Sequence, residues 1–409
     1  MLSNHILTNI KPESNADLYQ ALSCIFGAFY GDCLGSYVEF SRKNPNNYLK
    51  LMKGNNIFNN EPGQTTDDSE MAMSMAYAIM DTPNILSLNQ NLLFFYYGFW
   101  RRTFPPDIGR TTKNALDFFL DKRCQINDEK LFDKYRSHIK ALNDFSLANG
   151  FLMRISPLIV WYYYIYKNEI ISTLQGNPDK DKYIKLYLHL KSECYKDCEI
   201  THPNTETGTV SALFIFMALC AMIKLTANEI LEKLKYLVSL DIFNNEIEYP
   251  NENRLRMKIT SIITEFSDEK FDYDNYTKLI SEKSIGYYWH GLSLTLYFLY
   301  TFDNIECEFI SKYRHIMNEI ANIGGDTDTN CAIVGCVIGP LVGYTNFDSE
   351  FEICLKLVPK DRFMYSTAMM YYYVEYLENI TNNKQFESNE IRFNYYQMLL
   401  TLLNTTIKI

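Results

Sequence analysis

The sequence has little of three features that mark whole classes of proteins: excess positive charge, paired cysteines and long apolar segments. Its formal net charge is −10 at pH 7, whereas a general nucleic-acid binder needs a basic surface, so we expect no nucleic-acid partner. Its ten cysteines include no Cys-x-x-Cys pair. Cys194 and Cys198 lack the second pair that a zinc site would need, and several other cysteines lie in apolar runs, as buried reduced thiols do.

A targeting or membrane-spanning pattern is also missing. The first residues, MLSNHILTNIKPES, do not combine a basic stretch with an apolar core, as a secretory signal does. The longest apolar run, 210–223, has 14 residues, fewer than the roughly 20 that a helix needs to cross a bilayer. We therefore expect a soluble cytoplasmic protein that has no membrane partner and exists as a monomer.

Strand-like alternation of polar and apolar residues does not stand out, which favours an all-α fold. A helix is expected from about 18 to 40, where glycines recur every four residues from Gly27 to Gly35. The same spacing runs from Gly335 to Gly343 in a second apolar run, so both runs predict close helix packing. With 409 residues, 47% of them hydrophobic, the chain is long enough to bury a large core.

We predict one domain over most of the chain, interrupted by two polar segments. The domain is expected to cover 18–380, with insertions near 168–200 and 241–285, a polar leader at 1–17 and a C-terminal helical extension at 385–409. Acids and hydroxyls are concentrated where loops meet the predicted helices, and at these junctions we expect the functional residues.

The stretch 323–330, Ile-Gly-Gly-Asp-Thr-Asp-Thr-Asn, is the one around which the rest of the chain is organised. It places two carboxylates and two hydroxyls within four residues, ahead of an apolar run. Such oxygens can converge on one Mg²⁺, Mn²⁺ or Ca²⁺ ion. The alternative is a helix cap or a solvated acidic loop, which is the commoner use of such a turn. A second stretch of the same construction, Thr-Thr-Asp-Asp-Ser-Glu at 65–70, favours the metal site because it supplies the other half of an oxygen cage.

Other polar positions allow both a functional and a structural interpretation. Asp32 and Glu39, seven residues apart, resemble the acid pair of a glycosidase, although carboxylates at this spacing often only share a solvated helix face. The segment 107–112, Asp-Ile-Gly-Arg-Thr-Thr, is either a phosphate cradle at a helix start or an ordinary cap. Arg154 lies in an apolar run, which predicts a buried or paired guanidinium. A lone histidine before a helix, such as His202, is more often structural than functional.

Taken together and in this order, the motifs resemble the ADP-ribosylglycohydrolase family, which includes the dinitrogenase-reductase-activating glycohydrolase. Each motif alone is weak, but six of them in the family order are specific. The matching segments are 31–40 (GDCLGSYVEF), 63–76 (GQTTDDSEMAMSMA), 107–116 (DIGRTTKNAL), 148–158 (ANGFLMRISPL), 201–204 (THPN) and 324–339 (GGDTDTNCAIVGCVIG). The resemblance implies an all-α, orthogonal helical bundle around a central binuclear metal site, which would hold two divalent cations, Mg²⁺ or Mn²⁺.

The resemblance also implies roles for particular residues. The metal ligands would be Thr66, Asp67, Asp68, Asp326, Asp328 and Thr329. The catalytic carboxylates would be drawn from Glu39, Asp67 and Asp68. Substrate contacts would come from Gly109, Arg110, Thr111, Asn149, Gly150 and His202. Ser69 and Cys331 depart from the commoner family residues, but neither departure removes a ligand.

The activity that the resemblance implies is metal-dependent hydrolysis of the bond between ADP-ribose and a protein side chain. The partner would be an ADP-ribosylated protein or an ADP-ribose-containing small molecule. Two cations about 3.5–4 Å apart would orient a water and hold the ribose hydroxyls, while a carboxylate assists proton transfer. The segments 31–40 and 107–112 look closer to the arginine-directed branch, which slightly favours an N-glycosidic arginine linkage over an O-glycosidic serine linkage.

Other functions stay open at this point. Poly(ADP-ribose) and O-acetyl-ADP-ribose are further possible substrates, and a divalent-metal phosphohydrolase would use similar oxygen ligands. The alternative from another class is a non-catalytic ADP-ribose binder or a crystallin-like structural protein. Loss of the motif acids would mark such a protein, and here every one of them is present.

Overall fold

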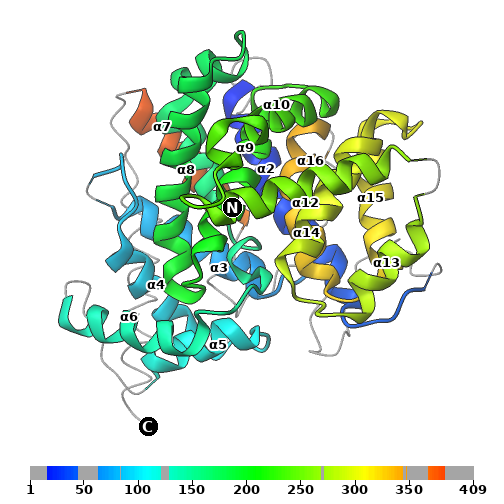
Figure 1. Ribbon diagram of the computed structural model, residues 1–409. Coiled ribbons are helices and arrows are strands. Elements are labelled where there is room, and N and C mark those ends of the chain that lie inside the picture. Colours follow the sequence, from blue (N-terminus) through cyan, green and yellow to red (C-terminus); the bar gives the residue numbers. More distant parts are fainter. Residues whose placement is uncertain are drawn as a thin grey trace.

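The computed structural model describes residues 16–44, 63–82, 84–120, 129–268, 271–343, 347 and 367–382. Within these ranges the protein is built of helices (Figure 1), and the only extended pairing is an isolated bridge between Ala148 and Tyr287. The all-α fold predicted from the sequence is therefore confirmed. The longer helices are α2 (Ala16–Gly35), α3 (Asp67–Met80), α4 (Gln90–Arg102), α6 (Glu129–Asn143), α7 (Ser156–Leu174), α8 (Lys180–Thr201), α9 (Thr205–Met222), α10 (Ala227–Ser239), α12 (Pro250–Phe266), α13 (Tyr273–Glu282), α14 (Tyr288–Thr301), α15 (Phe309–Ile323), α16 (Thr327–Val342) and α18 (Thr367–Thr381).

Shorter elements connect these helices and carry several of the predicted site residues. They are η2 (Ser36–Val38), α5 (Arg110–Leu116), η3 (Asp117–Phe119), η4 (Asn149–Phe151), α11 (Asp241–Asn244) and η5 (Phe302–Asn304). In Figure 1, α4, α5 and α6 lie at one side of the molecule and α13 and α15 at the opposite side, with α2 and α16 between them.

Helices α2 and α16 pack side by side through their glycines in the middle of the bundle. A Cβ atom on Gly27 would lie 2.2 Å from the carbonyl oxygen of Gly335, far closer than real Cβ atoms approach. The close packing that the glycine spacing predicts is thus present. Gly343 is not part of this contact: it ends α16 with φ +84° and donates its N–H to Gly339 O, as glycine at a helix C-terminus commonly does.

The helix expected over 18–40 is shorter at its C-terminal end than predicted. Helix α2 ends at Gly35, and the 3₁₀ turn η2 then leads to Glu39, whose backbone has φ −52° and ψ 139°. A Cβ on Gly35 would lie 2.4 Å from Thr327 O, so the chain passes the start of α16 at backbone contact before it turns away. Because Glu39 is outside the helix, the interpretation of Asp32 and Glu39 as neighbours on one helical face is wrong.

The two segments in which we predict insertions are largely helical and contribute to the core. Helix α8 packs against α9 and buries Tyr183, Leu186 and Leu190 along one face. Helices α11, α12 and α13 occupy most of 241–285. Their status as insertions stays a prediction. Residues 1–15 of the predicted leader and the whole predicted extension 385–409 lie outside the described residues, and the rest of the leader, residues 16 and 17, begins α2.

Two helical segments are long and apolar enough, by length and composition alone, to cross a membrane. They are Ala16–Val38 and Thr205–Met222, and the second is longer than the apolar run seen in the sequence because polar residues begin it. Both are packed inside the fold, with 89% and 94% of the tested windows buried. Core helices of this kind pass the same test, so the finding is weak evidence of a membrane span.

Candidate active site

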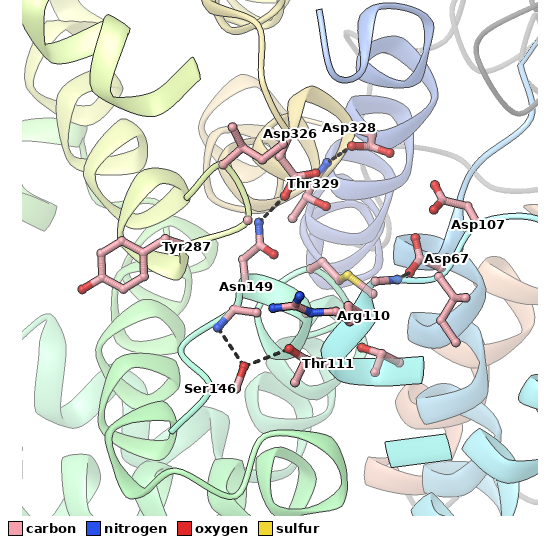
Figure 2. Close-up of a pocket in the computed structure, with 18 of the residues that line it drawn as sticks. Asp67, Asp107, Arg110, Thr111, Ser146, Asn149, Tyr287, Asp326, Asp328 and Thr329 are labelled. Atoms are coloured by element: carbon pink, nitrogen blue, oxygen red, sulfur yellow. Dashed lines mark hydrogen bonds between the residues drawn. The ribbon is translucent and has the colours of Figure 1, made fainter. Parts of the chain in front are cut away.

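A cavity of about 910 Å³ opens where loops meet the first turns of α3, α5 and α16, a size within the usual range of small-molecule pockets. Its walls come from residues 106–112, 146–150 and 284–287 and from the two acidic stretches. Figure 2 shows Asp326 and Asp328 on the same side as Asp67 and Asp107, with Asn149 between these acids and Tyr287. Arg110, Thr111 and Ser146 lie at the other end.

Two groups of buried carboxylates lie close enough to hold a cation each, and they share one member. Oxygens of Asp32, Asp68 and Asp328 lie within 4.8 Å of one another, and so do oxygens of Glu39, Asp326 and Asp328. These acids come from three segments that are far apart in the sequence. The convergence of the two acidic stretches predicted from the sequence is therefore present in the fold.

The acids do not act as helix caps. Thr66 is the N-cap residue of α3 and Asp326 is that of α16, yet neither side chain accepts a hydrogen bond from its own helix. The hydroxyl of Thr66 instead lies 2.9 Å from Asp32 Oδ1 and 2.8 Å from Asp68 Oδ2. Asp326 Oδ2 accepts a hydrogen bond of 2.7 Å from Asn149 Nδ2. Because these acids are also buried, they do not form a solvated loop either.

Asp32 anchors the second acidic stretch, residues 65–70, to helix α2 through hydrogen bonds. Its carboxylate accepts hydrogen bonds from the backbone N–H groups of Thr66 (3.0 Å) and Ser69 (3.2 Å) and from the Ser69 hydroxyl (2.6 Å). The serine in this position thus preserves a hydroxyl that binds Asp32. With both oxygens engaged, Asp32 fixes the start of α3, and this anchoring explains why an acid stands at this point of α2.

The predicted ligands differ in how closely they approach the two groups. Asp67 lies outside both groups: it faces the cavity, and its Oδ2 accepts a hydrogen bond of 3.2 Å from the N–H of Gly109. The Thr329 hydroxyl donates to Asp68 Oδ2 at 3.4 Å. Of the predicted ligands, the structure therefore places Asp68, Asp326 and Asp328 in the groups and Thr66, Asp67 and Thr329 beside them. The other two members of the groups, Asp32 and Glu39, were not predicted as ligands.

Crowding and burial make these carboxyls weak acids when no cation is present. Burial, followed by repulsion from Asp107, raises the pKa of Glu39 to about 10. Burial, followed by repulsion from Asp326, raises the pKa of Asp107 to about 7. The pKa values of Asp68 and Asp328 are raised well above the ordinary range, mainly by burial. Within the described part of the chain, Glu39 Oε2 and Asp68 Oδ1 are buried without a hydrogen-bond partner.

The residues predicted to bind substrate all line the same cavity. Gly109 directly precedes the seven-residue helix α5, and its N–H is already engaged by Asp67, so its predicted part in a phosphate cradle stays a prediction. The Thr111 hydroxyl lies 2.8 Å from that of Ser146. The other four are Arg110, Asn149, Gly150 and His202.

Sequence reasoning missed several residues of this cavity, among them Asp107, Ser146 and Tyr287. Asp107 begins the segment 107–112, yet only the positions from Gly109 onward received a role; its acidity among other acids was the available signal. Tyr287 had no signal, because its loop reaches the cavity through backbone pairing. Asn149 donates its N–H to Gly286 O at 2.9 Å, and Tyr288 donates to Leu147 O at 3.1 Å.

The buried guanidinium predicted at position 154 is present next to the cavity. Arg154 is fully buried and forms an ion pair with Asp197, with Nη2 and Oδ2 3.0 Å apart. His202 is also buried, and its ring lines the cavity. Burial, together with the charge of Arg154, lowers the pKa of His202 well below its usual value, so this imidazole is neutral.

Comparisons with known proteins show which sequences and folds this chain is similar to. A family model described as ADP-ribosylglycohydrolase matches residues 14–362. A protein of Acanthamoeba polyphaga mimivirus named as an ADP-ribosyl glycohydrolase is 26% identical over 333 residues, which cover 79% of this chain and 86% of that protein. An ADP-ribosylarginine hydrolase of Serratia proteamaculans is 31% identical over 115 residues, 27% of this chain and 30% of that protein. A solved structure described as an ADP-ribosylglycohydrolase-related protein complex shares the fold with a TM-score of 0.55 at 17% identity, covering 90% of this chain and 99% of that one.

Proposed function

The chain belongs to the ADP-ribosylglycohydrolase family, whose name denotes hydrolysis of glycosidic linkages to ADP-ribose, and on that premise we propose that it removes ADP-ribose from modified protein side chains with the help of two divalent cations. The observation that carries the proposal is the pair of buried carboxylate groups that share Asp328 at one end of a nucleotide-sized cavity. The family resemblance implies roles for most of these residues, and the structure adds that the oxygens in each group lie within 4.8 Å of one another.

The donor set fits Mg²⁺ or Mn²⁺. Every atom in the two groups is a carboxylate oxygen, and hard divalent cations prefer such ligands. Buried oxygens of Glu39 and Asp68 have no partner among the described residues, so a cation would meet donors that the protein leaves unused. One group would use Asp68 and Asp328, with the hydroxyls of Thr66 and Thr329 beside them. The other would use Glu39, Asp326 and Asp328. Bound cations would supply positive charge to a water and to the ribose hydroxyls.

The protein's own carboxyls would handle the protons of the reaction. Hydrolysis breaks the bond between the anomeric carbon and the side-chain atom, and a water loses a proton while the leaving group gains one. Asp67 lines the cavity and lies outside both carboxylate groups, so we assign proton transfer to Asp67 and ligation to Asp68 and Glu39. Asp67 also accepts a hydrogen bond from the N–H of Gly109, which holds its carboxyl at the cavity wall; in the cation-free protein, burial raises its pKa well above the ordinary value.

The rest of the cavity suits the nucleotide part of ADP-ribose. Arg110 brings a guanidinium, Thr111 and Ser146 bring hydroxyls, and Tyr287 brings an aromatic ring. Asn149 is held by Asp326 and stands between the acids and this end, where it can contact the ribose.

We favour ADP-ribosyl-arginine as the linkage. The support is the motif similarity in 31–40 and 107–112 and the Serratia relative that is named as an ADP-ribosylarginine hydrolase. A binder without catalytic activity is the second candidate, but nothing in the cavity favours it, because each predicted acid is present and buried at the site.

The test is release of free ADP-ribose from arginine-modified and serine-modified proteins, with Mg²⁺ or Mn²⁺ and with EDTA. We expect metal-dependent release, faster from the arginine-modified protein. Equal release in EDTA would contradict the role of the cations, and faster release from the serine-modified protein would reverse the linkage. If ADP-ribose binds by calorimetry but no release occurs from either substrate, the protein is a binder.

A further inference from the structure

Phe40 is a large aromatic residue in an unusual place, directly after Glu39 on the wall of the cavity. It is only partly buried, with 48% of its surface exposed. Its backbone has φ +57°, in the left-handed region that disfavours bulky side chains. A conformation of this kind persists only where the surrounding structure imposes it, and such residues are concentrated at active sites and ligand clamps. An exposed aromatic side chain held in this way points to a contact with a ligand.

Backbone hydrogen bonds hold Phe40 against the acidic stretch around Asp326. The N–H of Phe40 donates to Gly325 O at 2.7 Å, and the N–H of Gly325 donates to Ser41 O at 2.8 Å. Gly325 directly precedes Asp326, which belongs to the same carboxylate group as Glu39. Phe40 therefore lies at the acid-rich end of the cavity, where Figure 2 shows Asp326 and Asp328 and where the bond to ADP-ribose would be broken.

The two candidate linkages differ in the charge of the group that would stand at this end. In ADP-ribosyl-arginine the anomeric carbon is bonded to a guanidinium, which is planar and positively charged, whereas in ADP-ribosyl-serine it is bonded to an uncharged oxygen. A guanidinium stacks on an aromatic ring because the face of the ring carries partial negative charge. A ring beside carboxylates therefore attracts the arginine-linked group and offers the serine-linked oxygen no comparable contact.

We propose that Phe40 is a specificity-determining residue whose ring stacks against the guanidinium of the ADP-ribosylated arginine. The inference rests on the proposed function and deepens it, because it names the part of the cavity that distinguishes the arginine linkage from the serine linkage. The contact exists in the bound substrate as well as in the transition state. It should therefore act mainly on KM and only weakly on kcat.

The test uses one peptide that carries ADP-ribose on either an arginine or a serine, and it compares Phe40→Leu with Phe40→Tyr in the 409-residue protein with Mn²⁺. Leucine keeps an apolar side chain and removes the ring, whereas tyrosine keeps the ring. In Phe40→Leu, the ratio of kcat/KM for the arginine peptide to that for the serine peptide should fall about 2-fold to 5-fold, the loss of one cation–aromatic contact at a partly exposed site. Phe40→Tyr should keep the ratio of the wild type.

Free ADP-ribose provides a second measurement, because it has no guanidinium. Calorimetry should give a similar Kd for ADP-ribose in the wild type and in Phe40→Leu, while the KM for the arginine peptide rises about 2-fold to 5-fold. If release from the serine peptide is too slow to measure, this pair of values makes the same comparison.

The matched control is Phe104→Leu. Phe104 is also an exposed phenylalanine with a left-handed backbone, with φ +52° and 66% of its surface exposed. It is not among the described residues that line the cavity. Its replacement should change neither the KM for the arginine peptide nor the ratio.

Three results would overturn the role of Phe40 and leave the proposed hydrolysis intact. They are an unchanged KM in Phe40→Leu, an equal loss for the two linkages, and an equal weakening of free ADP-ribose binding. A wild-type protein that prefers the serine peptide would overturn this role together with the proposed linkage. One that releases ADP-ribose from neither peptide would overturn the proposed function, and the role of Phe40 with it.

Discussion

Two buried polar regions border the cavity, and their charges are balanced in opposite ways. In the acidic groups, carboxylates crowd together with raised pKa values, and oxygens of Glu39 and Asp68 have no partner among the described residues. In the region around Arg154, the guanidinium meets a carboxylate, a carbonyl and a hydroxyl, all within hydrogen-bonding distance. The acidic groups have no positive charge beside them among their own members, whereas the charge of Arg154 is balanced by Asp197.

We interpret the acidic groups as the candidate binding site and the buried residues around Arg154 as structural support next to it. Unpaired buried carboxylates are unfavourable unless a proton or a cation neutralises them. We therefore interpret the acidic groups as a candidate cation site. A paired guanidinium contributes rigidity, and removing one partner leaves a buried charge alone. The two regions should consequently respond in opposite directions when a charge is removed.

The largest effect is expected from Asp328→Asn, because Asp328 belongs to both acidic groups. The change keeps the shape of the side chain and removes one negative charge. Hydrolysis should fall by roughly a thousandfold or more, as expected when a binuclear site loses a shared ligand. The metal-free protein should keep its thermal stability or gain some, because repulsion is reduced. ADP-ribose release and thermal unfolding in EDTA measure the two quantities.

The matched control for that variant is Asp181→Asn on the exposed start of α8, which should change neither quantity. Near-normal turnover in Asp328→Asn would show that the acids are not metal ligands. A strongly destabilised metal-free variant would show that Asp328 is a structural residue, and the contrast between the two regions would then fail.

The opposite response is expected from Arg154→Leu, which leaves Asp197 buried and unpaired. The free energy of unfolding should fall by about 3–5 kcal/mol, the usual consequence of breaking a buried ion pair on one side. Denaturant unfolding measures it. Lys185→Met is the control, since the Lys185–Glu169 pair is exposed and such pairs contribute about 0–1 kcal/mol. Equal losses of unfolding free energy in the two variants would mean that the buried Arg154–Asp197 pair contributes no more to stability than the exposed Lys185–Glu169 pair.

An effect of similar size is expected from cation binding to the unchanged protein, and it should depend on pH. Each site at a cation concentration of 100 times Kd should add about 2.7 kcal/mol to the stability. Without cations, Asp107 keeps its proton up to about pH 7 in the folded state, while an unfolded aspartate loses it near its usual pKa of about 3.9. Between these values the unfolded chain binds fewer protons, so the stability falls as the pH rises.

The same sign holds for Glu39, whose pKa is raised to about 10, so the metal-free protein should keep losing stability above neutral pH. Thermal unfolding from pH 5 to pH 9, in EDTA and in Mn²⁺, tests this. We expect a falling curve in EDTA and a flatter, higher one in Mn²⁺. Parallel curves would mean that the cations bind elsewhere.

How far the sequence predicts this site depends on how each wall is built. The acidic stretches carry their own pattern of carboxylates and hydroxyls, and the glycine spacing predicts close packing for each of the two runs; both expectations are met in the structure. That the two runs pack against each other is a finding of the structure. The end of α2 at Gly35 was not predictable from the glycine spacing, because Gly27 and Gly31 contact α16 just as closely and yet lie inside the helix. The roles of Asp32 and Thr66 depend on hydrogen bonds between segments, which no local pattern contains.

The loop around Tyr287 shows the same limit. Hydrogen bonds between backbone groups of 286–288 and 147–149 attach it to the cavity wall. Because almost every residue type has the same backbone groups, the sequence does not indicate such a contact. Thr201 and His202 were visible as a motif, but the hydrogen bond that the Thr201 hydroxyl accepts from Arg154 joins residues 47 positions apart in the chain. Asp107 is the intermediate case: its residue type was visible, but its neighbours were not.

Asp107 also gives the smallest effect and the finest test of the contrast. Among the charged groups, Asp107 contributes most to raising the pKa of Glu39 and of Asp67. Asp107→Asn should lower both pKa values, and it removes the titration of Asp107 itself. The metal-free stability should therefore fall less steeply between pH 4 and pH 7 than in the wild type, while the Arg154–Asp197 pair is unaffected. Thermal unfolding in EDTA across this range measures the slope. An unchanged slope would mean that Asp107 is not part of the acidic region and only lines the cavity.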